Sequence, residues 1–339
     1  MAENILEIKN LSFSFKTYGG VVKAVRNVSY NLRRGEVLGV VGESGCGKSV
    51  TAQCIMRLNP EPPGFFEGGE ILFKGRDVLK MNKRELRELR SKDIGFIFQD
   101  PMTSLNPTMR VGYQIDEVFH GHKGISRGEV KEKTLNIMKL VGISDAEKRY
   151  RQYPHELSGG MKQRIMIAMA LVSEPSMIIC DEPTTSLDVT IEAQILDLLL
   201  ELRDKLGTSI IMITHDLGVI ARLCDRVVVM YGGKVAETGT VDEIFYETAH
   251  PYTRGLMNSI ASLETDKSTV LTPIPGTPPD LFAPPAGCPF AARCDYCMQV
   301  CHKYPPEYTR LSDEHVSACW LHHELAPHVD LRMPGKEKV

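Results

Sequence analysis

Residues 42–49 carry the clearest chemical pattern in the chain. They fit the phosphate-loop pattern G-x-x-x-x-G-K-[ST] and read Gly42-Glu43-Ser44-Gly45-Cys46-Gly47-Lys48-Ser49. In such a loop the glycines let backbone N–H groups turn toward an anion, the lysine reaches the β- and γ-phosphates, and the serine hydroxyl ligates Mg²⁺. A glycine-rich turn with a chance Lys-Ser pair is the alternative. The flanking pattern favours phosphate binding, because an apolar run at 36–41 predicts a buried strand and residues 49–58 predict a helix.

Polar residues follow three further apolar runs, at the points where parallel strands would end. Gln99 follows residues 94–98, Asp181 and Glu182 follow 177–180, and His215 comes shortly after 209–213. In an open α/β sheet, ligands bind at the carboxyl ends of the strands. Asp181 can hold Mg²⁺ and Glu182 can polarise an attacking water, while His215 can bond a γ-phosphate. Taken alone, Gln99 or His215 is also compatible with a purely structural role.

A second helix start has the features of an anion site. Ser158 is a plausible N-cap for a helix over 162–173, and Gly159 and Gly160 leave the N–H groups of the first turn uncovered. One nucleotide does not need two such helix starts side by side. The alternative is a simple N-cap in front of a buried helix.

The remaining pattern predicts an α/β protein with a largely parallel, helix-covered sheet, because strands and helices alternate from residue 36 to residue 231. Residues 5–15 and 22–32 predict an antiparallel pair of strands, and Phe15 at the end of the first is either an adenine-stacking aromatic or an ordinary strand residue. We expect a Pro/Gly loop over 60–69, an edge strand over 70–73, irregular structure over 100–107 and a hairpin over 226–238. Helices are expected over 83–91, 111–141 (broken near 121–127) and 189–206.

Composition limits the classes of function. The chain has 339 residues, which predicts one large domain plus an appendage, and its net charge of −3 does not favour a nucleic-acid partner. No apolar run approaches the ~20 residues that a membrane-spanning helix needs. The first four residues lack the features of a signal peptide, so we expect a cytosolic chain.

Five of the nine cysteines lie close together near the C-terminus, with the spacing Cys288-x5-Cys294-x2-Cys297-x3-Cys301-x17-Cys319. This Pro-rich segment has little apolar core of its own, so a cross-link or a metal would help it to fold. Disulfides are rare in the cytosol. Zinc would fit Cys294 and Cys297 with two later ligands, a four-iron cluster would need four thiolates, and a module without metal is the third alternative.

Taken together, the motifs resemble the ATP-binding subunits of ABC transporters over roughly residues 1–245, with a helical subdomain at about 100–170. The resemblance rests on the order of six motifs: phosphate loop (42–49), Q-loop (Gln99), signature (157–161), Walker B (177–182), D-loop (186–188) and switch (His215). The signature has Met161 where glutamine is commonest, and methionine is also frequent in the peptide-importer branch. The resemblance implies the P-loop NTPase fold of an ABC nucleotide-binding domain and ATP hydrolysis with Mg²⁺.

The same resemblance assigns roles to individual residues. Phe15 stacks on adenine, and residues 42–49 with Val50 hold ATP, with Lys48 on the phosphates. Ser49 and Gln99 are Mg²⁺ ligands, Asp181 contacts Mg²⁺ through water, and Glu182 is the general base. His215 contacts the γ-phosphate. Two subunits of this family meet head to tail, so Ser158, Gly159, Gly160 and Asp188 serve the nucleotide of the partner.

The residues after 245 resemble the C-terminal extension of oligopeptide and dipeptide importer ATPases, a branch that also includes nickel importers. The resemblance covers about 246–325 and includes His250-Pro251-Tyr252 and Gly287-Cys288-Pro289-Phe290. It implies a module at 288–319 in which Cys288, Cys294, Cys301 and Cys319 bind a [4Fe-4S] cluster in some members; Cys297 departs from the pattern.

The resemblance implies a peripheral motor at the cytoplasmic face of the membrane that powers peptide import. Its partners would be a second ABC ATPase subunit, a paralogue rather than a copy of this chain, and two membrane permease subunits, with an extracytoplasmic solute-binding protein involved indirectly. Nickel or another solute as cargo is the alternative, and a soluble ABC ATPase outside transport is the more distant one. The soluble ABC ATPases usually carry tandem ATPase units or a long coiled coil, and neither occurs here.

Overall fold

The computed structural model describes residues 3–119, 124–185, 188–259 and 273–332. The chain divides into two compact units. The helical unit consists mainly of Lys80–Ile213 with Arg33–Glu36. The β unit consists of Asn4–Leu32, Val37–Leu79 and the chain from Thr214 onward.

The N-terminal strands of the β unit form an antiparallel sheet. Its order is β2-β1-β4-β5, with β1 at Asn4–Thr17, β2 at Gly20–Arg33, β4 at Gly64–Phe73 and β5 at Arg76–Asp77. β1 pairs with β4 from Leu6 opposite Phe73 to Phe15 opposite Gly64. The strands predicted over 5–15 and 22–32 are therefore confirmed as neighbours in one sheet.

β4 corrects two expectations from the sequence. The loop expected over 60–69 ends at residue 63, because β4 begins at Gly64. The strand expected over 70–73 is confirmed, but it is not an edge strand, because β4 lies between β1 and β5. A Cβ at Gly64 would lie 2.4 Å from the Phe13 ring, and one at Gly69 would lie 2.6 Å from the Asn10 carbonyl oxygen. The register also shifts between Lys9 and Ser12, as at a β-bulge. These glycines therefore permit close approach of two strands and do not mark a turn.

The second sheet of the β unit carries the phosphate loop. Its order is β11-β12-β10-β9-β3, with β3 at Val37–Val41, β9 at Arg226–Tyr231, β10 at Lys234–Thr240, β11 at Thr309–Arg310 and β12 at Val316–Ser317. β3 runs parallel to β9, and β9 and β10 form the predicted antiparallel hairpin. The helices of this unit are α1 (Lys48–Ile55), α9 (Leu217–Leu223), α10 (Val241–Tyr246), α11 (Pro251–Asn258) and α12 (Gln299–Lys303), with 3₁₀ turns η1 (Val78–Lys80), η5 (Ala291–Arg293) and η6 (Trp320–His322).

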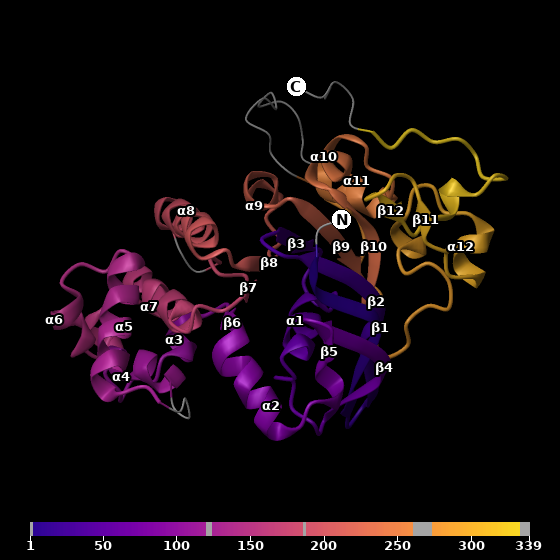
Figure 1. Ribbon diagram of the computed structural model, residues 1–339. Coiled ribbons are helices and arrows are strands. Elements are labelled where there is room, and N and C mark those ends of the chain that lie inside the picture. Colours follow the sequence, from indigo (N-terminus) through magenta and orange to yellow (C-terminus); the bar gives the residue numbers. More distant parts are fainter. Residues whose placement is uncertain (1–2, 120–123, 186–187, 260–272, 333–339) are drawn as a thin grey trace. The chain divides into compact units, whose positions relative to one another are not determined.

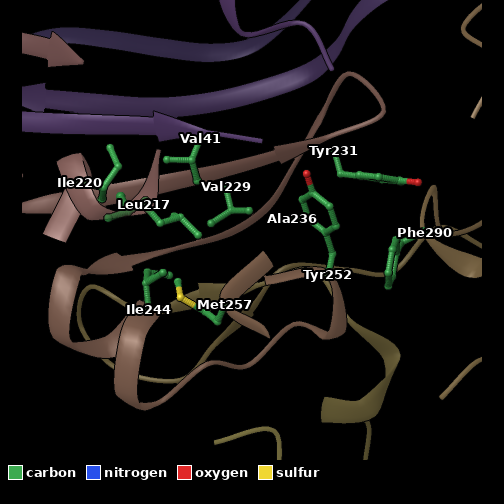
Figure 2. Close-up of a cluster of buried hydrophobic side chains, with 11 residues drawn as sticks. Val41, Leu217, Ile220, Val229, Tyr231, Ala236, Ile244, Tyr252, Met257 and Phe290 are labelled. Carbon is green, nitrogen blue, oxygen red and sulfur yellow. The ribbon is translucent and has the colours of Figure 1, made fainter. Parts of the chain in front are cut away.

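The core of the β unit joins the strand before the phosphate loop to the C-terminal region (Figure 2). Its buried members come from β3, α9, β9, β10, α10, α11 and the segment before η5, and are Val41, Leu217, Ile220, Val227, Val229, Tyr231, Ala236, Ile244, Tyr252, Met257 and Phe290. Cys288 and Cys294 pack against the same cluster. The cysteine segment has few apolar residues of its own, and it packs against a core that it shares with the rest of the β unit.

The helical unit contains three parallel strands in the order β8-β7-β6, with β6 at Ile94–Ile97, β7 at Met177–Asp181 and β8 at Ser209–Ile213. Ile97 lies opposite Cys180, and Cys180 lies opposite Met212. β7 and β8 are buried along their whole length, as expected for parallel strands covered on both faces. The carboxyl ends of these strands therefore lie at one edge.

The helices of this unit are α2 (Lys83–Glu88), the π-helix η2 (Leu89–Asp93), α3 (Pro101–Ser104), α4 (Val111–Asp116), η3 (Glu117–Phe119), α5 (Arg127–Leu140), α6 (Ala146–Tyr150), η4 (Pro154–Glu156), α7 (Gly159–Leu171) and α8 (Val189–Leu206). Figure 1 shows α4, α5, α6 and α7 gathered beside one another, and α4 and α5 each contact the other three helices. The short α3 corrects the expectation of irregular structure over 100–107. The expected break near 121–127 falls partly on residues 120–123, which lie outside the described residues.

Candidate active site and cysteine module

The phosphate loop has the backbone that only glycine permits at two points. Gly42 has φ of 152°, and a Cβ there would lie 2.2 Å from the Met230 carbonyl oxygen. Gly47 has φ of 98°, and its Cβ would lie 2.4 Å from the Ala24 carbonyl oxygen. Gly47 also caps the start of α1 in a left-handed conformation. The loop therefore packs tightly between β2 and β9 and delivers the chain into a helix whose positive end faces the loop.

Lys48 lies inside the loop and is 5% exposed. Its Nζ donates to the carbonyl oxygens of Gly42, at 2.7 Å, and Glu43, at 3.1 Å. Ser44 and Gly45 are exposed at the tip, and Ser49 is half-buried in the first turn of α1. Burial raises the pKa of the Cys46 thiol, so this cysteine is a packing residue of the loop and not a nucleophile.

Glu43 makes two contacts that are not predicted from the sequence. Its carboxylate accepts a two-pronged hydrogen bond from the Arg293 guanidinium, at 2.6 and 2.9 Å. Its backbone N–H donates to the hydroxyl of Tyr252, at 2.8 Å. Both partners belong to the C-terminal region. Tyr252 belongs to the motif that marks the C-terminal extension, but neither it nor Arg293 fits a nucleotide-binding motif, so the sequence does not predict their contact with the phosphate loop.

Phe15 is half-buried near the end of β1, where its ring meets that of Phe13 edge to face at a centroid distance of 5.1 Å. The partly exposed ring leaves a surface for stacking. Adenine binding by Phe15 stays a prediction.

Gln99, Asp181 and Glu182 come together at the strand ends of the helical unit, as their positions predict. The Nε2 of Gln99 donates to Oε2 of Glu182 at 2.9 Å. Asp181 is the last residue of β7 and is 6% exposed. A side-chain amide and two carboxylates at one sheet edge form a set of oxygen ligands suited to Mg²⁺.

The geometry around Glu182 orients its carboxylate. Its φ is 47°, a left-handed conformation, and its N–H donates to the Ile213 carbonyl at 2.9 Å. The hydroxyl of Thr185 donates to the same Oε2 at 3.0 Å. Sequence reasoning missed Thr185, since a threonine in a loop carries no signal of its own. A carboxylate fixed in this way can accept a proton from a water in one defined direction.

His215 lies in the β unit and is exposed. The residues on either side of it are anchored: Thr214 donates its N–H to the Val40 carbonyl at 3.3 Å, and Asp216 caps α9 by accepting from Gly218 N–H at 2.7 Å. Val40 belongs to the strand that leads into the phosphate loop. The backbone at His215 is therefore tied to that strand.

The second helix start has the expected form. Ser158 caps α7, accepting from the Met161 N–H at 3.4 Å, and Ser158 and Gly159 are exposed. Asp188 caps α8 by accepting from the Ile191 N–H at 3.0 Å. The other two D-loop positions, Ser186 and Leu187, lie outside the described residues.

Four of the five C-terminal cysteines line one small cavity of about 20 Å³ together with His250, Phe290 and Trp320; they are Cys288, Cys294, Cys301 and Cys319. Cys297 is not among the residues that line it, and its Sγ lies 3.3 Å from Nε2 of His302. Burial raises the pKa of Cys288 to about 11 and those of Cys294 and Cys319 to about 12. Within the described parts of the chain, no three His, Cys, Asp or Glu side chains are close enough to hold one metal ion.

Comparisons with known proteins identify the family of this chain. Residues 25–185 match the ABC transporter family, and residues 236–301 match the C-terminal region of oligopeptide/dipeptide transporters. The chain is 55% identical to the oligopeptide transport ATP-binding protein OppD of Bacillus subtilis, covering 99% of this chain and 94% of that one. It is 52% identical to the dipeptide transport ATP-binding protein DppD of the same organism, covering 99% and 100%. The chain belongs to the ATP-binding proteins of oligopeptide and dipeptide ABC transporters.

The fold of this ABC transporter ATP-binding protein is shared with solved relatives. The dimeric ATP-binding cassette MJ0796, bound to ADP and Pi, superposes with a TM-score of 0.62 at 27% identity, over 70% of this chain and 98% of that one. The predicted family and the P-loop fold with a mostly parallel sheet are confirmed. None of the helices in the described part of this ATP-binding protein is long and apolar enough to span a bilayer.

Proposed function

We propose that this ABC transporter ATP-binding protein hydrolyses ATP to power the import of di- and oligopeptides through a membrane transporter. Hydrolysis rests on the Glu182 carboxylate, which Gln99 and Thr185 orient at the strand ends of the helical unit. The proposal that peptides are the cargo is supported by the relatives, which are named for oligopeptide and dipeptide transport and match over nearly the whole chain.

Some of the proposed site residues bind ATP and Mg²⁺, and Glu182 accepts a proton. The backbone of residues 42–49 with Val50 holds the phosphates, Lys48 neutralises their charge, and Phe15 stacks on adenine. Ser49, Gln99 and Asp181 would hold Mg²⁺, which neutralises charge on the β- and γ-oxygens when it is bound. Glu182 takes a proton from water as the water oxygen bonds to the γ-phosphorus and the bond to the ADP oxygen breaks. His215 donates to the γ-phosphate.

The exposed start of α7 serves a second subunit. Ser158, Gly159 and Gly160 present uncovered N–H groups at the positive end of a 13-residue helix, which suits the γ-phosphate of a partner's ATP. Asp188 lies at the same interface. We propose a paralogous ATP-binding subunit as partner, with two permease subunits that hold the pair at the cytoplasmic face of the membrane and a solute-binding protein acting on the outer side.

The cysteine module would hold a [4Fe-4S] cluster on Cys288, Cys294, Cys301 and Cys319. The supporting observation is that these four thiols line one cavity, whereas Cys297 does not. In such a cluster each thiolate binds its own iron, so the four sulfurs need not converge on one atom. When bound, the cluster would cross-link four points of a segment that is poor in apolar core. Zinc on a subset of these ligands is the alternative.

Peptide uptake by proteoliposomes tests the function. The chain is reconstituted with its paralogue, the permease subunits and the solute-binding protein, with ATP supplied on the side of the ATP-binding subunits. With the wild-type chain, we expect labelled di- and tripeptides to accumulate inside the proteoliposomes in an ATP-dependent manner. With the Glu182→Gln chain, we expect no accumulation. Uptake of Ni²⁺ instead of peptides would contradict peptides as the cargo and would support ATP-driven import. ATP hydrolysis without uptake of either would contradict an import function.

A further inference from the structure

One ion pair joins the C-terminal region to the phosphate loop. Arg293 and Glu43 are 250 positions apart in the sequence, yet their side chains form a two-pronged pair with N–O distances of 2.6 and 2.9 Å. The Arg293 side chain is 5% exposed and that of Glu43 is 26% exposed. Both residues lie within the β unit. A pair of this geometry, with one partner buried, fixes the direction of the carboxylate.

The backbone of Arg293 belongs to the cysteine module, and its guanidinium also bonds to residues outside that module. Arg293 ends η5, which lies between Cys288 and Cys294. Its guanidinium also donates to the carbonyls of Ile274, at 3.0 Å, and Pro275, at 2.8 Å, and to the Tyr231 hydroxyl at 3.1 Å. The position of this charge therefore depends on the fold of the module.

The main chain of Glu43 is held from the same side. Its N–H donates to Tyr252, which is fully buried in α11. The ring of Tyr252 packs on Tyr231 at a centroid distance of 4.5 Å and on Phe290 at 5.4 Å (Figure 2). Side chain and backbone of one loop residue are thus both bonded to the C-terminal region.

The charge of Glu43 explains why such a contact would matter. A phosphate loop collects N–H groups and a helix dipole to bind a polyanion, and a carboxylate in that loop opposes the binding. Arg293 turns the Glu43 carboxylate toward the module and neutralises it. Without Arg293, a partly buried negative charge would stand unpaired beside the phosphates.

We propose that Arg293 is a positioning residue for ATP, through which the folded cysteine module raises the affinity of the phosphate loop for nucleotide. The proposal rests on ATP binding by residues 42–49, as given under the proposed function. It is independent of which metal, if any, the module holds.

A double-mutant cycle on the full-length chain tests this role. Arg293→Met should raise the Kd and KM for ATP on the order of tenfold, while kcat stays within about twofold, because the lost interaction acts on binding. Glu43→Gln alone is the reference for the cycle, and Arg293→Met combined with Glu43→Gln should regain most of the affinity that Arg293→Met loses, because the offending charge is gone. Arg310→Met, at an exposed arginine of β11, is the matched control and should leave Kd unchanged.

The outcomes separate the possibilities. An unchanged Kd in Arg293→Met overturns the proposal, and so does a raised Kd that Glu43→Gln fails to restore, which would indicate a purely structural role. If Arg293→Met does not fold, Arg293→Lys takes its place, with an expected rise of roughly threefold and the same rescue. Failure of the wild-type chain itself to bind ATP would instead overturn the proposed function.

Discussion

At the scale of single residues, the proposed hydrolytic centre depends on how the carboxylate of Glu182 is held. Gln99 and Thr185 both donate to Oε2 of Glu182, and the left-handed backbone of Glu182 is tied to the Ile213 carbonyl. These contacts fix the direction of the carboxylate. The proposed general base is therefore oriented before substrate binds.

Thr185 offers a test of this orientation. Thr185→Val keeps the shape and removes one hydrogen bond to the carboxylate, so we expect kcat for ATP to fall roughly 3- to 10-fold with KM nearly unchanged. Steady-state hydrolysis over a range of ATP concentrations measures both. Thr190→Val, at an exposed position of α8, is the control. Equal kcat values for the two variants would show that Thr185 does not act on Glu182.

The sequence predicts that Gln99, Asp181 and Glu182 lie at one edge of the sheet, because each follows an apolar run and parallel strands end at a common edge. Thr185 could not be found this way. Its role depends on how the chain turns after Pro183, and a turn leaves no periodic pattern.

At the scale of elements, the helical unit is held together by contacts around Tyr150. Its ring packs on α4, where a Cβ at Gly112 would lie 2.1 Å from the ring. Its hydroxyl donates to Asp116 of α4, and Asp116 also accepts from Thr134 of α5 at 2.6 Å. One tyrosine and one aspartate thereby connect α4, α5 and α6.

Gly112→Ala should destabilise this unit. The added methyl must displace the Tyr150 ring, and such overpacking costs about 1–3 kcal/mol of unfolding free energy. Gly128→Ala in α5 meets only Ser126 Oγ at 3.9 Å and should be neutral or slightly stabilising. Thermal unfolding of both variants measures the difference. Equal melting temperatures would contradict the packing described here.

The wrong prediction of a loop over all of residues 60–69 is explained by how two strands pair. Pro and Gly over 60–69 favour a loop when only local preference is considered. Gly64 and Gly69 instead lie where β1 approaches most closely. Only the pairing partner decides between these two uses of glycine. Gly64 meets Phe13 and Gly69 meets Asn10, and in both cases the partner lies more than fifty positions away along the chain.

At the scale of the whole molecule, the C-terminal region completes the β unit. Tyr252, Met257 and Phe290 share a core with Val41 of β3, and Arg293 pairs with the phosphate loop. No sequence pattern connects residues 250 positions apart, so this relation could only come from the fold. The cysteine spacing predicted a small module clamped by a cross-link or a metal, because this segment has little apolar core of its own, and the set of four thiols came from the family resemblance.

The metal content of cysteine variants tests the ligand set. Protein purified without oxygen should contain about four irons and four sulfides per chain. Cys288→Ser and Cys319→Ser should each lose most of the iron and melt several degrees lower, at about 2–4 °C per kcal/mol for a chain of this size. Cys297→Ser should retain the iron, because its thiol does not line the cavity.

Several results would change that assignment. About one zinc per chain and no iron would keep the module and replace its cofactor. Unchanged metal content in both Cys288→Ser and Cys319→Ser would rule out this ligand set, and loss of iron in Cys297→Ser would place Cys297 among the ligands.

The central claim is that Glu182 removes the proton in an ATP-driven motor, and the most direct test compares wild type with Glu182→Gln. The amide keeps an oxygen that can accept from Gln99 and Thr185 but cannot act as a base. ATP binding, measured by titration, should stay within about threefold of wild type, while kcat should fall at least ~100-fold. Hydrolysis by Glu182→Gln at a rate near that of the wild type would contradict the account.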